Sequence, residues 1–429
     1  MPTGELHLAW TPARGVLHAP ASMDEVRAVD ARVEGDRDML RLLHLADVHL
    51  GARHPELGAA GEIQRERQFQ AFERAMELAV SERCAVVVVA GDLFDSNAQP
   101  RRSVERAARA LAVAVAGGAV VAILPGDSDP YDASSLYRTY DLAALAGIPE
   151  TDGIHVLEPG SRTLVLPSLD VAVRAYVAGD GTSLDDALRE PRDEAETGVR
   201  LRVGVAHLGA EAVPPTDEAL EAAGLDYLAL GGTLGPAHGA AGSAQWADPG
   251  PLEWLARPAD ARPADARPAD AESAGQALLV VLDPGARGRT RIEARVVGRT
   301  RRLHLELGAA DFTDDVALAD HLGTLADPDL ACDLRLVGQR PPDLRIDEAS
   351  LETRLAPSFL RLRVVDTTLA PPPGGPTPPV ESIAGAFISD VRGRMDRAIA
   401  DERSEDAREL GEELELGMRL LAGSTGMPV

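Results

Sequence analysis

The sequence predicts a mixed α/β (α+β) fold, and two features of the chain indicate it. Short apolar runs have the length and composition of buried strands: Leu40–Ala46, Ala85–Ala90, Val120–Leu124, Leu201–Ala206 and Tyr227–Leu230. Two stretches between the first three runs, Glu62–Arg83 and Arg101–Ala116, carry apolar residues at helical spacing. Strands that alternate with helices predict a parallel or mixed sheet covered by helices.

The size of the chain predicts more than one domain. It has 429 residues, of which 45% are hydrophobic, so it can bury a substantial core and form two or three domains. We expect residues 1–39 to be a flexible N-terminal extension, because they mix Pro, Gly, Asp and Glu without the apolar stretch of a secretory signal. The first domain is then expected to span residues 40–300. Its RPADA repeats at residues 257–271 form a low-complexity, solvated insertion.

Two further segments follow. Strand and helix patterns alternate from residue 301 to residue 366 and predict a small α/β capping domain. After a proline-rich linker, residues 380–423 carry apolar side chains every four positions and are predicted to form C-terminal helices. These helices either pack as a pair on the capping domain or offer an apolar stripe to a partner. Near the domain boundary, Arg289, Arg291 and Arg295 share one face of a predicted strand, for which a solvated face is favoured over a phosphate-contact patch.

Charge and composition restrict the function. The formal net charge is −26, which disfavours bulk attraction to nucleic acid or to an anionic membrane, so contact with a phosphate backbone needs a local patch or a partner. The chain contains no lysine, which excludes P-loop ATPases, Schiff-base enzymes and pyridoxal-phosphate enzymes. Cys84 and Cys332 form no CxxC pair and predict no disulfide framework. This fits a reducing cytoplasm, and no apolar run is long enough to predict a membrane span.

Acidic residues directly follow three of the predicted strands. Asp47 and His49 follow the first, Asp92 the second and Asp127 the third. Ligand sites in open α/β sheets lie at the carboxyl ends of the strands, so we expect these side chains to share one crevice. Crowded carboxylates and an imidazole need a cation, and oxygen and nitrogen ligands suit Mn²⁺, Fe²⁺ or Zn²⁺. A carboxylate of the middle strand could bridge two ions about 3.5–4 Å apart, as in two-metal phosphoester hydrolysis.

Two of these turns resemble a known family. The segments HLADVHLG (residues 44–51) and AGDLFDSN (residues 90–97) are similar to motifs of the calcineurin-like metallophosphoesterases, and within them to the DNA-repair exonuclease subunit of the SbcCD type. The combination of DxHLG with a later GDLFD at a strand end is specific, whereas DxH alone is weak. The resemblance implies a β-sandwich flanked by helices, a capping domain and a two-metal site. It also implies DNA as substrate and a partner ATPase with a coiled-coil arm.

The resemblance also implies roles for individual residues. Asp47 and His49 would hold one metal ion, Asp92 would bridge both ions, and His207 would hold the other. Asp127 stands where the family has asparagine and can still offer an oxygen. The expected cofactor is a divalent metal, most readily Mn²⁺, as one or two weakly held ions.

The chain departs from the family at two motifs. The family's GNHD is GDSD here, so Ser128 occupies the position of the general-acid histidine, and a hydroxyl is too weak an acid for that role. The family's GHxH is GGTL here, so Gly232 and Leu234 replace two further histidines. We expect neither His54 nor His238, which lie in nearby loops, to substitute. The alignment predicts that histidines restored at 128, 232 and 234 raise the affinity for metal.

Three functions follow from this pattern. The first is metal-dependent hydrolysis of DNA phosphodiester bonds by an exonuclease-type subunit with reduced activity. The alternative is a catalytically decayed nuclease-fold subunit that acts as a scaffold for a coiled-coil ATPase partner or for DNA. A phosphoesterase of small substrates is a weaker third reading, because the capping domain and the C-terminal helices argue against it. Whether the site is active is left open, and a homodimer is a further expectation.

Overall fold

The computed structural model describes most of the chain. The described residues are 39–149, 153–177, 182–209, 213–233, 235–255, 274–285, 290–341, 343–368, 379–400 and 403–423. The predicted N-terminal extension, the RPADA insertion and the proline-rich linker lie outside them, as does Leu234.

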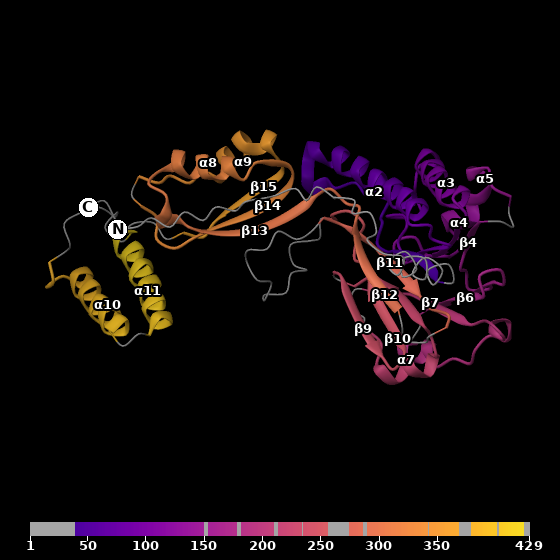
Figure 1. The fold of residues 1–429 in the computed structure, drawn as a ribbon. Helices are drawn as coiled ribbons and strands as arrows, with labels where there is room; N and C mark the ends of the chain where they lie inside the picture. The colour runs from indigo at the N-terminus through magenta and orange to yellow at the C-terminus, as the bar shows by residue number, and fades with distance from the viewer. Residues whose placement is uncertain are drawn as a thin grey trace, which may run out of the picture.

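Two six-stranded sheets form the larger part of the molecule (Figure 1). The first has the order β12 (Thr290–Val296), β11 (Gln276–Leu282), β1 (Leu40–Leu45), β2 (Val86–Ala90), β3 (Val120–Leu124) and β4 (Ile154–Val156). The second has the order β5 (Thr163–Leu166), β6 (Val171–Tyr176), β7 (Leu201–His207), β8 (Tyr227–Gly231), β10 (Ala244–Asp248) and β9 (Ala237–Ala241). Strands β1 to β4 run parallel in the first sheet, and β6, β7, β8 and β10 run parallel in the second. The carboxyl ends of each parallel set therefore lie at one edge.

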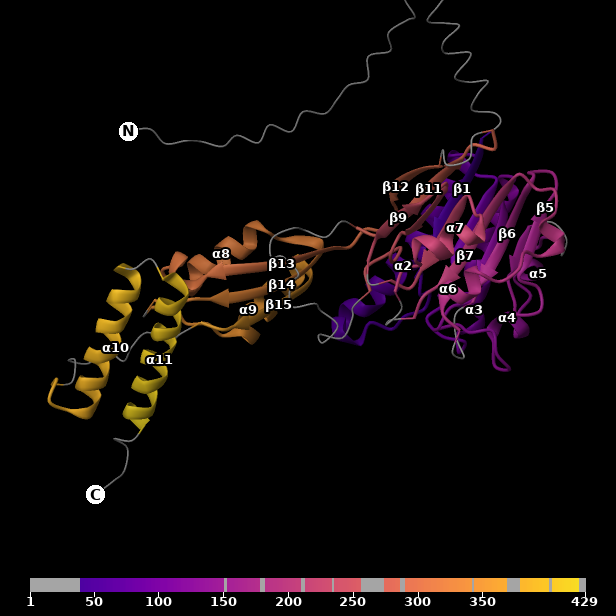
Figure 2. The same ribbon diagram turned by 90° about the horizontal axis from the view of Figure 1, so that it is seen from below.

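The two sheets pack face to face. Successive side chains of a strand point to opposite faces of its sheet, so one strand can contribute to two buried clusters. In β1, Leu42 joins a buried cluster shared with residues of the second sheet, whereas Leu43 joins a cluster on the other face. Helices α2 (Gly61–Ser81) and α3 (Arg101–Ala116) cover that other face, while α6 (Leu184–Leu188) and α7 (Asp217–Ala223) pack on the outside of the second sheet (Figure 2). The predicted β-sandwich flanked by helices is confirmed, and β3 and α3 have the predicted bounds.

A third sheet lies beyond the sandwich. Parallel strands β13 (Arg301–Gly308), β14 (Asp327–Val337) and β15 (Phe359–Asp366) carry α8 (Asp315–Thr324) and α9 (Glu348–Leu355) on one face (Figure 1). The apolar residues Cys332, Leu334 and Leu336 of β14 point into the core beneath these helices. Strand β14 begins with Asp327, Pro328 and Asp329, which follow no apolar pattern, and a register shift lies between Asp327 and Ala331.

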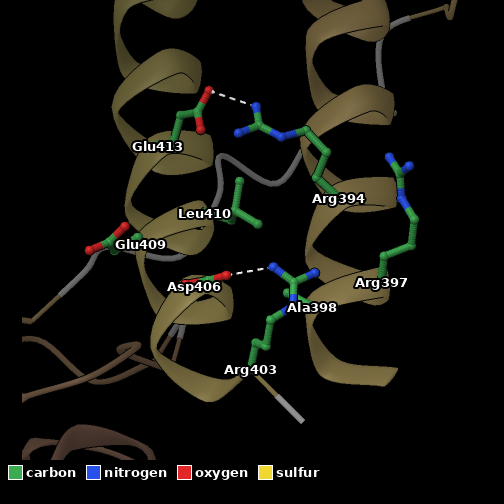
Figure 3. Close-up of a pocket in the computed structure, with 8 residues that line it drawn as sticks. All are labelled: Arg394, Arg397, Ala398, Arg403, Asp406, Glu409, Leu410 and Glu413. Carbon is green, nitrogen blue, oxygen red and sulfur yellow. Dashed lines mark hydrogen bonds and ion pairs between the residues drawn. The ribbon is translucent and has the colours of Figure 1, made fainter. Parts of the chain in front are cut away.

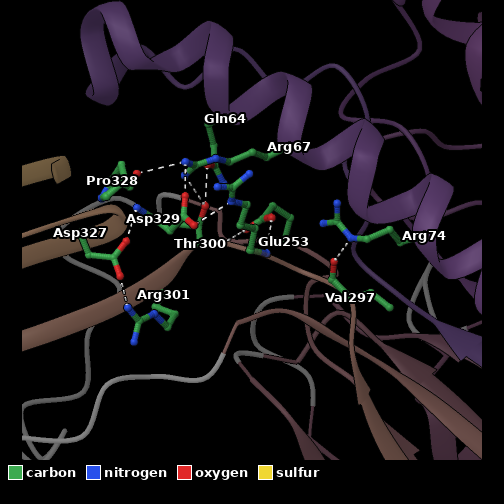
Figure 4. A network of polar contacts seen from close by, with 11 residues as sticks. Gln64, Arg67, Arg74, Glu253, Val297, Thr300, Arg301, Asp327, Pro328 and Asp329 are labelled. Carbon is green, nitrogen blue, oxygen red and sulfur yellow. Dashed lines mark hydrogen bonds and ion pairs between the residues drawn. The ribbon is translucent and has the colours of Figure 1, made fainter. Parts of the chain in front are cut away.

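Polar contacts join α2 to this third sheet (Figure 4). The Arg67 guanidinium donates to Asp329 Oδ1 at 2.6 Å and to Thr300 Oγ1 at 3.1 Å. The Thr300 hydroxyl in turn donates to Gln64 Oε1 at 2.9 Å, and the Thr300 amide donates to Glu253 at 2.9 Å. Arg67, Gln64, Glu253 and Thr300 are all buried, so loss of one partner leaves another without compensation.

The C-terminal helices α10 (Ile383–Ala400) and α11 (Ser404–Gly423) pack mainly against each other. Phe387 lies so close to Gly417 that a Cβ added to this glycine would come within 2.2 Å of its ring. Arg394 pairs with Glu413 at 3.3 Å across an open, polar groove of about 730 Å³ between the helices (Figure 3). Among the described residues, α10 and α11 thus pack as a helical pair.

Two smaller findings concern expected binding surfaces. Arg291 and Arg295 of β12 each pair with Glu293, at 2.9 and 2.7 Å, which supports a solvated face over a phosphate-contact patch. Arg289 lies outside the described residues. Among the helices of the described part of the chain, none has the length and hydropathy needed to cross a bilayer.

Candidate metal centre

The turns that follow β1 and β2 run side by side. The amide of His49 donates to the carbonyl oxygen of Asp92 at 2.9 Å, and the amide of Leu50 donates to that of Leu93 at the same distance. These bonds continue the parallel pairing of β1 and β2 beyond the sheet edge. As a result, ligand atoms of Asp47, His49 and Asp92 all lie within 4.8 Å of one another. Two carboxylates and an imidazole at this spacing fit a divalent cation such as Mn²⁺, Fe²⁺ or Zn²⁺.

The backbone at all three positions is strained. Asp47, His49 and Asp92 have φ values of 49°, 47° and 52°, in the left-handed region that residues with a Cβ rarely adopt. Each such residue costs on the order of 1–3 kcal/mol, and such strain persists where surrounding structure fixes it, most often at functional sites. The neighbouring Gly91, with φ of 90°, must be glycine, because an added Cβ would lie 2.0 Å from His207 Nδ1. Asp and His adopt this region more readily than most residues with a Cβ, so the argument for function is that three such residues gather in one cluster.

His207, at the end of β7, completes the cluster from the second sheet. Its Nδ1 lies 3.0 Å from the carbonyl oxygen of Ala90, which directs Nε2 toward Asp92 Oδ2 at 3.5 Å. His49 Nε2 approaches the same oxygen at 3.3 Å, while its Nδ1 lies 3.4 Å from Asp95. The Asp92 carboxylate thus lies between two imidazoles, the place that a bridging ligand needs.

The cluster is electrostatically coupled. Burial disfavours the charged form of His207, but the Asp92 and Asp47 carboxylates outweigh it and raise the pKa of His207 to about 9. The pKa of His49 is also raised, since Asp95, Asp92 and Asp47 outweigh the effect of burial. Burial raises the pKa of Asp47, whereas for Asp92 the imidazoles overcome burial and lower the pKa. Because metal ligands must be deprotonated, a cation binding here would displace protons from the imidazoles.

The turn after β3 holds the Asp92 carboxylate through hydrogen bonds from Ser128. The amide of Ser128 donates to Asp92 Oδ1 at 2.8 Å, and its hydroxyl donates to Oδ2 at 3.0 Å. Asp127, by contrast, is exposed and lies outside the group of three ligands. Of the predicted ligands, the structure brings Asp47, His49 and Asp92 together, places His207 against Asp92, and leaves Asp127 at the surface.

The turn after β8 has no room for an imidazole at Gly232. This residue has φ of 84°, and a Cβ added there would lie 1.9 Å from the carbonyl oxygen of Leu208. Its amide donates to Asp47 Oδ2 at 3.0 Å instead. A backbone N–H therefore contacts the carboxylate where the alignment expects a metal ligand, and a histidine restored at position 232 does not fit this backbone.

Sequence analysis missed Asp248. This buried residue ends β10, and its two oxygens accept from the amides of Thr233 at 3.0 Å and Gly250 at 2.6 Å. Burial and then the charge of Asp47 raise its pKa to about 6. The signal that could have found it is an acidic residue at the end of a strand and next to a glycine-containing turn, as at Asp92 and Asp127.

The remaining histidines near the motifs have other environments. His44 is a core residue of β1: it is buried, its Nδ1 lies 2.8 Å from the Tyr227 hydroxyl, and burial lowers its pKa to about 3. His54 is buried with its Nε2 3.1 Å from Gln68 Oε1. His238 is exposed on the edge strand β9. His238 therefore lies in a strand and not in the expected loop, and neither histidine is among the ligands that converge in the described site.

Parts of the chain are similar to known proteins. Residues 40–232 match the family of calcineurin-like phosphoesterases. The DNA double-strand break repair protein Mre11 of Aeropyrum pernix is 35% identical over 136 residues, which cover 32% of each chain. The protein of the same name from Methanosarcina acetivorans is 46% identical over 61 residues, 14% of this chain and 9% of that protein. The chain therefore matches a third or less of the length of these relatives. The solved structure of TT1561 from Thermus thermophilus aligns over 60% of this chain and 99% of that chain, with 13% identity and a TM-score of 0.36.

Proposed function

We propose, on the premise that residues 40–232 form a calcineurin-like phosphoesterase domain, that this chain is a DNA-repair nuclease subunit with reduced activity. In this proposal it binds a divalent cation and hydrolyses DNA phosphodiester bonds. The observation that carries the proposal is the convergence of Asp47, His49 and Asp92, all in strained left-handed conformations, at the edge of the first sheet. Residues in such conformations gather at functional sites, and three of them gather here.

The ligand roles follow from the contacts. Asp47, His49 and Asp92 would hold one cation, and Asp92 with His207 offers a weaker second position. A bound cation supplies Lewis-acid polarisation of the phosphoryl oxygen and an activated water. Oxygen and nitrogen donors suit Mn²⁺, Fe²⁺ or Zn²⁺, and of these we propose Mn²⁺ as the cofactor. Asp127 is exposed, so we propose it as a ligand only if its side chain turns inward.

The reduced activity follows from Ser128. Its hydroxyl holds the Asp92 carboxylate at 3.0 Å but is too weak an acid to protonate a leaving oxygen near neutral pH. Loss of a general acid typically costs 10²–10⁴-fold in rate. We therefore expect slow cleavage.

The substrate and partner are inferred from the relatives. Mre11 proteins are named for repair of DNA double-strand breaks, and we propose DNA as the substrate here. A chain with net charge −26 gains little from bulk attraction to DNA. A coiled-coil ATPase subunit that docks on α10 and α11 would supply the missing affinity. A homodimer and a cytoplasmic location stay predictions.

A second candidate is a scaffold that has lost catalysis. The observation that favours it is Gly232, whose backbone contacts Asp47 and excludes an imidazole. In this case the chain would keep its contacts with the partner or DNA but would not cleave.

One experiment separates the two. Purified protein is incubated with end-labelled linear duplex DNA and Mn²⁺, next to Asp92→Asn and a control variant, Asp217→Asn, which changes an exposed residue of α7. Slow Mn²⁺-dependent cleavage that Asp92→Asn abolishes and Asp217→Asn keeps supports the nuclease. Mn²⁺ binding without cleavage supports the scaffold. If neither binding nor cleavage occurs, the proposed function is wrong.

A further inference from the structure

A second carboxylate lies behind the candidate metal site. Asp129 is fully buried and accepts three hydrogen bonds from neutral donors. Its Oδ1 accepts from the amide of Gly126 at 2.8 Å, and its Oδ2 accepts from the amide of Phe94 at 2.9 Å and from the Tyr137 hydroxyl at 2.5 Å. Within the described residues Asp129 has no cationic partner. A buried carboxylate is costly unless its oxygens are satisfied, so these bonds hold Asp129 in one orientation.

The hydrogen bonds of Asp129 connect the turn after β2 to the turn after β3. Phe94 lies two residues after Asp92, and Gly126 lies two residues before Ser128, whose amide and hydroxyl both hold Asp92. The turns approach so closely that a Cβ added to Gly126 would come within 2.2 Å of Asp92 Oδ1. Asp129 therefore fixes the backbone on both sides of the Asp92 carboxylate.

Tyr137 is itself held in place from the second turn. The side chain of Asn97 donates to the carbonyl oxygen of Pro130 at 2.9 Å and accepts from the amide of Leu136 at 3.0 Å. These bonds anchor helix α4 (Leu136–Thr139), from which Tyr137 points into the core. The Tyr137 ring packs against that of Phe94, with centroids 6.2 Å apart. The position of the Tyr137 hydroxyl against Asp129 is therefore fixed by these contacts.

We propose that Asp129 and Tyr137 form a positioning pair that sets the Asp92 carboxylate for a cation. The inference rests on the proposed function, because it assumes that Asp92 binds metal. Asp92 has φ of 52°, a conformation that persists only when its surroundings determine it. The Tyr137 hydroxyl orients Asp129, Asp129 holds the Phe94 amide, and the strained turn keeps the carboxylate aimed at His49 and His207. Neither member of the pair touches the reacting atoms.

The test compares Tyr137→Phe and Asp129→Asn with Tyr140→Phe. Tyr137→Phe removes only a hydroxyl. Tyr140 belongs to the same segment, is partly buried, and its hydroxyl makes no hydrogen bond among the described residues, so Tyr140→Phe is a matched control. The Mn²⁺ dissociation constant is measured by calorimetry and the melting temperature is measured without metal. We expect Tyr137→Phe and Asp129→Asn to weaken Mn²⁺ binding by about 10-fold, the lower end of the range for direct partners of a metal ligand, because the pair acts through the Phe94 and Gly126 amides. Tyr140→Phe should leave the binding unchanged.

The outcomes are distinguishable. A purely structural role lowers the melting temperature of Tyr137→Phe but leaves its Mn²⁺ affinity at the wild-type value, and this result overturns the inference while the proposed function stands. If the wild-type protein binds no Mn²⁺, both fail together. If Asp129→Asn does not fold, the single hydroxyl removed in Tyr137→Phe still decides the question.

Discussion

His207 Nε2 lies 3.5 Å from Asp92 Oδ2, although the two residues come from strands of different sheets. The contact joins the carboxyl ends of β2 and β7 across the sandwich. It exists because Gly91 leaves space for the imidazole and because the carbonyl oxygen of Ala90 fixes the other ring nitrogen. One carboxylate thereby serves two histidines, and several consequences can be measured.

Metal-free protein should lose stability as the pH rises through the titration of His207. The pKa of His207 is raised from 6.5 to about 9 by the Asp92 and Asp47 carboxylates against the effect of burial. A raised folded-state pKa stabilises the fold fully below pH 6.5, and this contribution is lost as the pH rises toward 9. Urea unfolding with chelator across this window measures the slope. His207→Gln should flatten it and His321→Gln, an exposed control, should not. A wild-type slope in His207→Gln would contradict the assignment.

Gly232→Ala should destabilise the protein more than Gly118→Ala. Both glycines have positive φ, 84° and 94°, so each alanine costs about 1–2 kcal/mol in backbone strain. Only the alanine at 232 also meets a backbone atom, the carbonyl oxygen of Leu208 at 1.9 Å, whereas nothing lies within 4 Å at Gly118. The overpacking adds roughly 1–3 kcal/mol, measurable by urea unfolding. Equal losses in the two variants would mean that the turn adapts to a side chain.

Ser128→His should increase DNA cleavage without the other restored histidines. Position 128 is partly exposed and next to Asp92, so an imidazole there can supply the missing general acid. The expected gain is about 10²–10⁴-fold in rate. A Ser134→His variant, on an exposed turn, controls for an added histidine. If the rate of Ser128→His equals that of Ser134→His in single-turnover assays, loss of the general acid does not limit the activity.

Arg67→Met should cost more stability than Arg65→Met. The Arg67 side chain is 9% exposed and binds Asp329 at 2.6 Å, so its removal leaves a carboxylate with less compensation in a largely buried joint. Asp329 is 21% exposed and keeps its pair with Arg299 at 2.7 Å, so the cost should fall below the roughly 3–5 kcal/mol of breaking a fully buried pair. Arg65 forms a pair with the exposed Glu62 one turn away on α2, which is worth roughly 0.2–1 kcal/mol. Its Nε also donates to the carbonyl oxygen of Ala52 at 3.1 Å, a hydrogen bond worth about 0.5–1.5 kcal/mol. Chemical denaturation of the two variants compares these costs. Similar losses would show that the joint between α2 and the third sheet contributes little.

Much of the fold could be predicted from the sequence because its strands are apolar on both faces. Strand β2 is buried at every position, and its run of valines has no alternative but a central strand. The start of β14 could not be predicted in this way, because the polar residues Asp327 and Asp329 owe their place to contacts with Arg301 and Arg67 from other elements. Such contacts have no local pattern.

The candidate site likewise has features that the sequence predicts and features that depend on distant contacts. The proximity of Asp47 and Asp92 could be predicted from the sequence, since parallel neighbouring strands end at one edge. The left-handed backbone of these residues, the lack of space at Gly232 and the role of Asp248 depend on atoms from distant turns. For Asp127 the spacing argument indicated a ligand, but the turn after β3 directs Ser128 and Asp129 inward instead and leaves Asp127 exposed.

Calorimetric titration of the purified chain with Mn²⁺ tests the central claim most directly. The account predicts saturable binding to the wild-type protein with release of protons, loss of that binding in Asp47→Asn and Asp92→Asn, and wild-type binding in Asp217→Asn. Wild-type affinity in Asp92→Asn, or no binding by the wild-type protein, would contradict it.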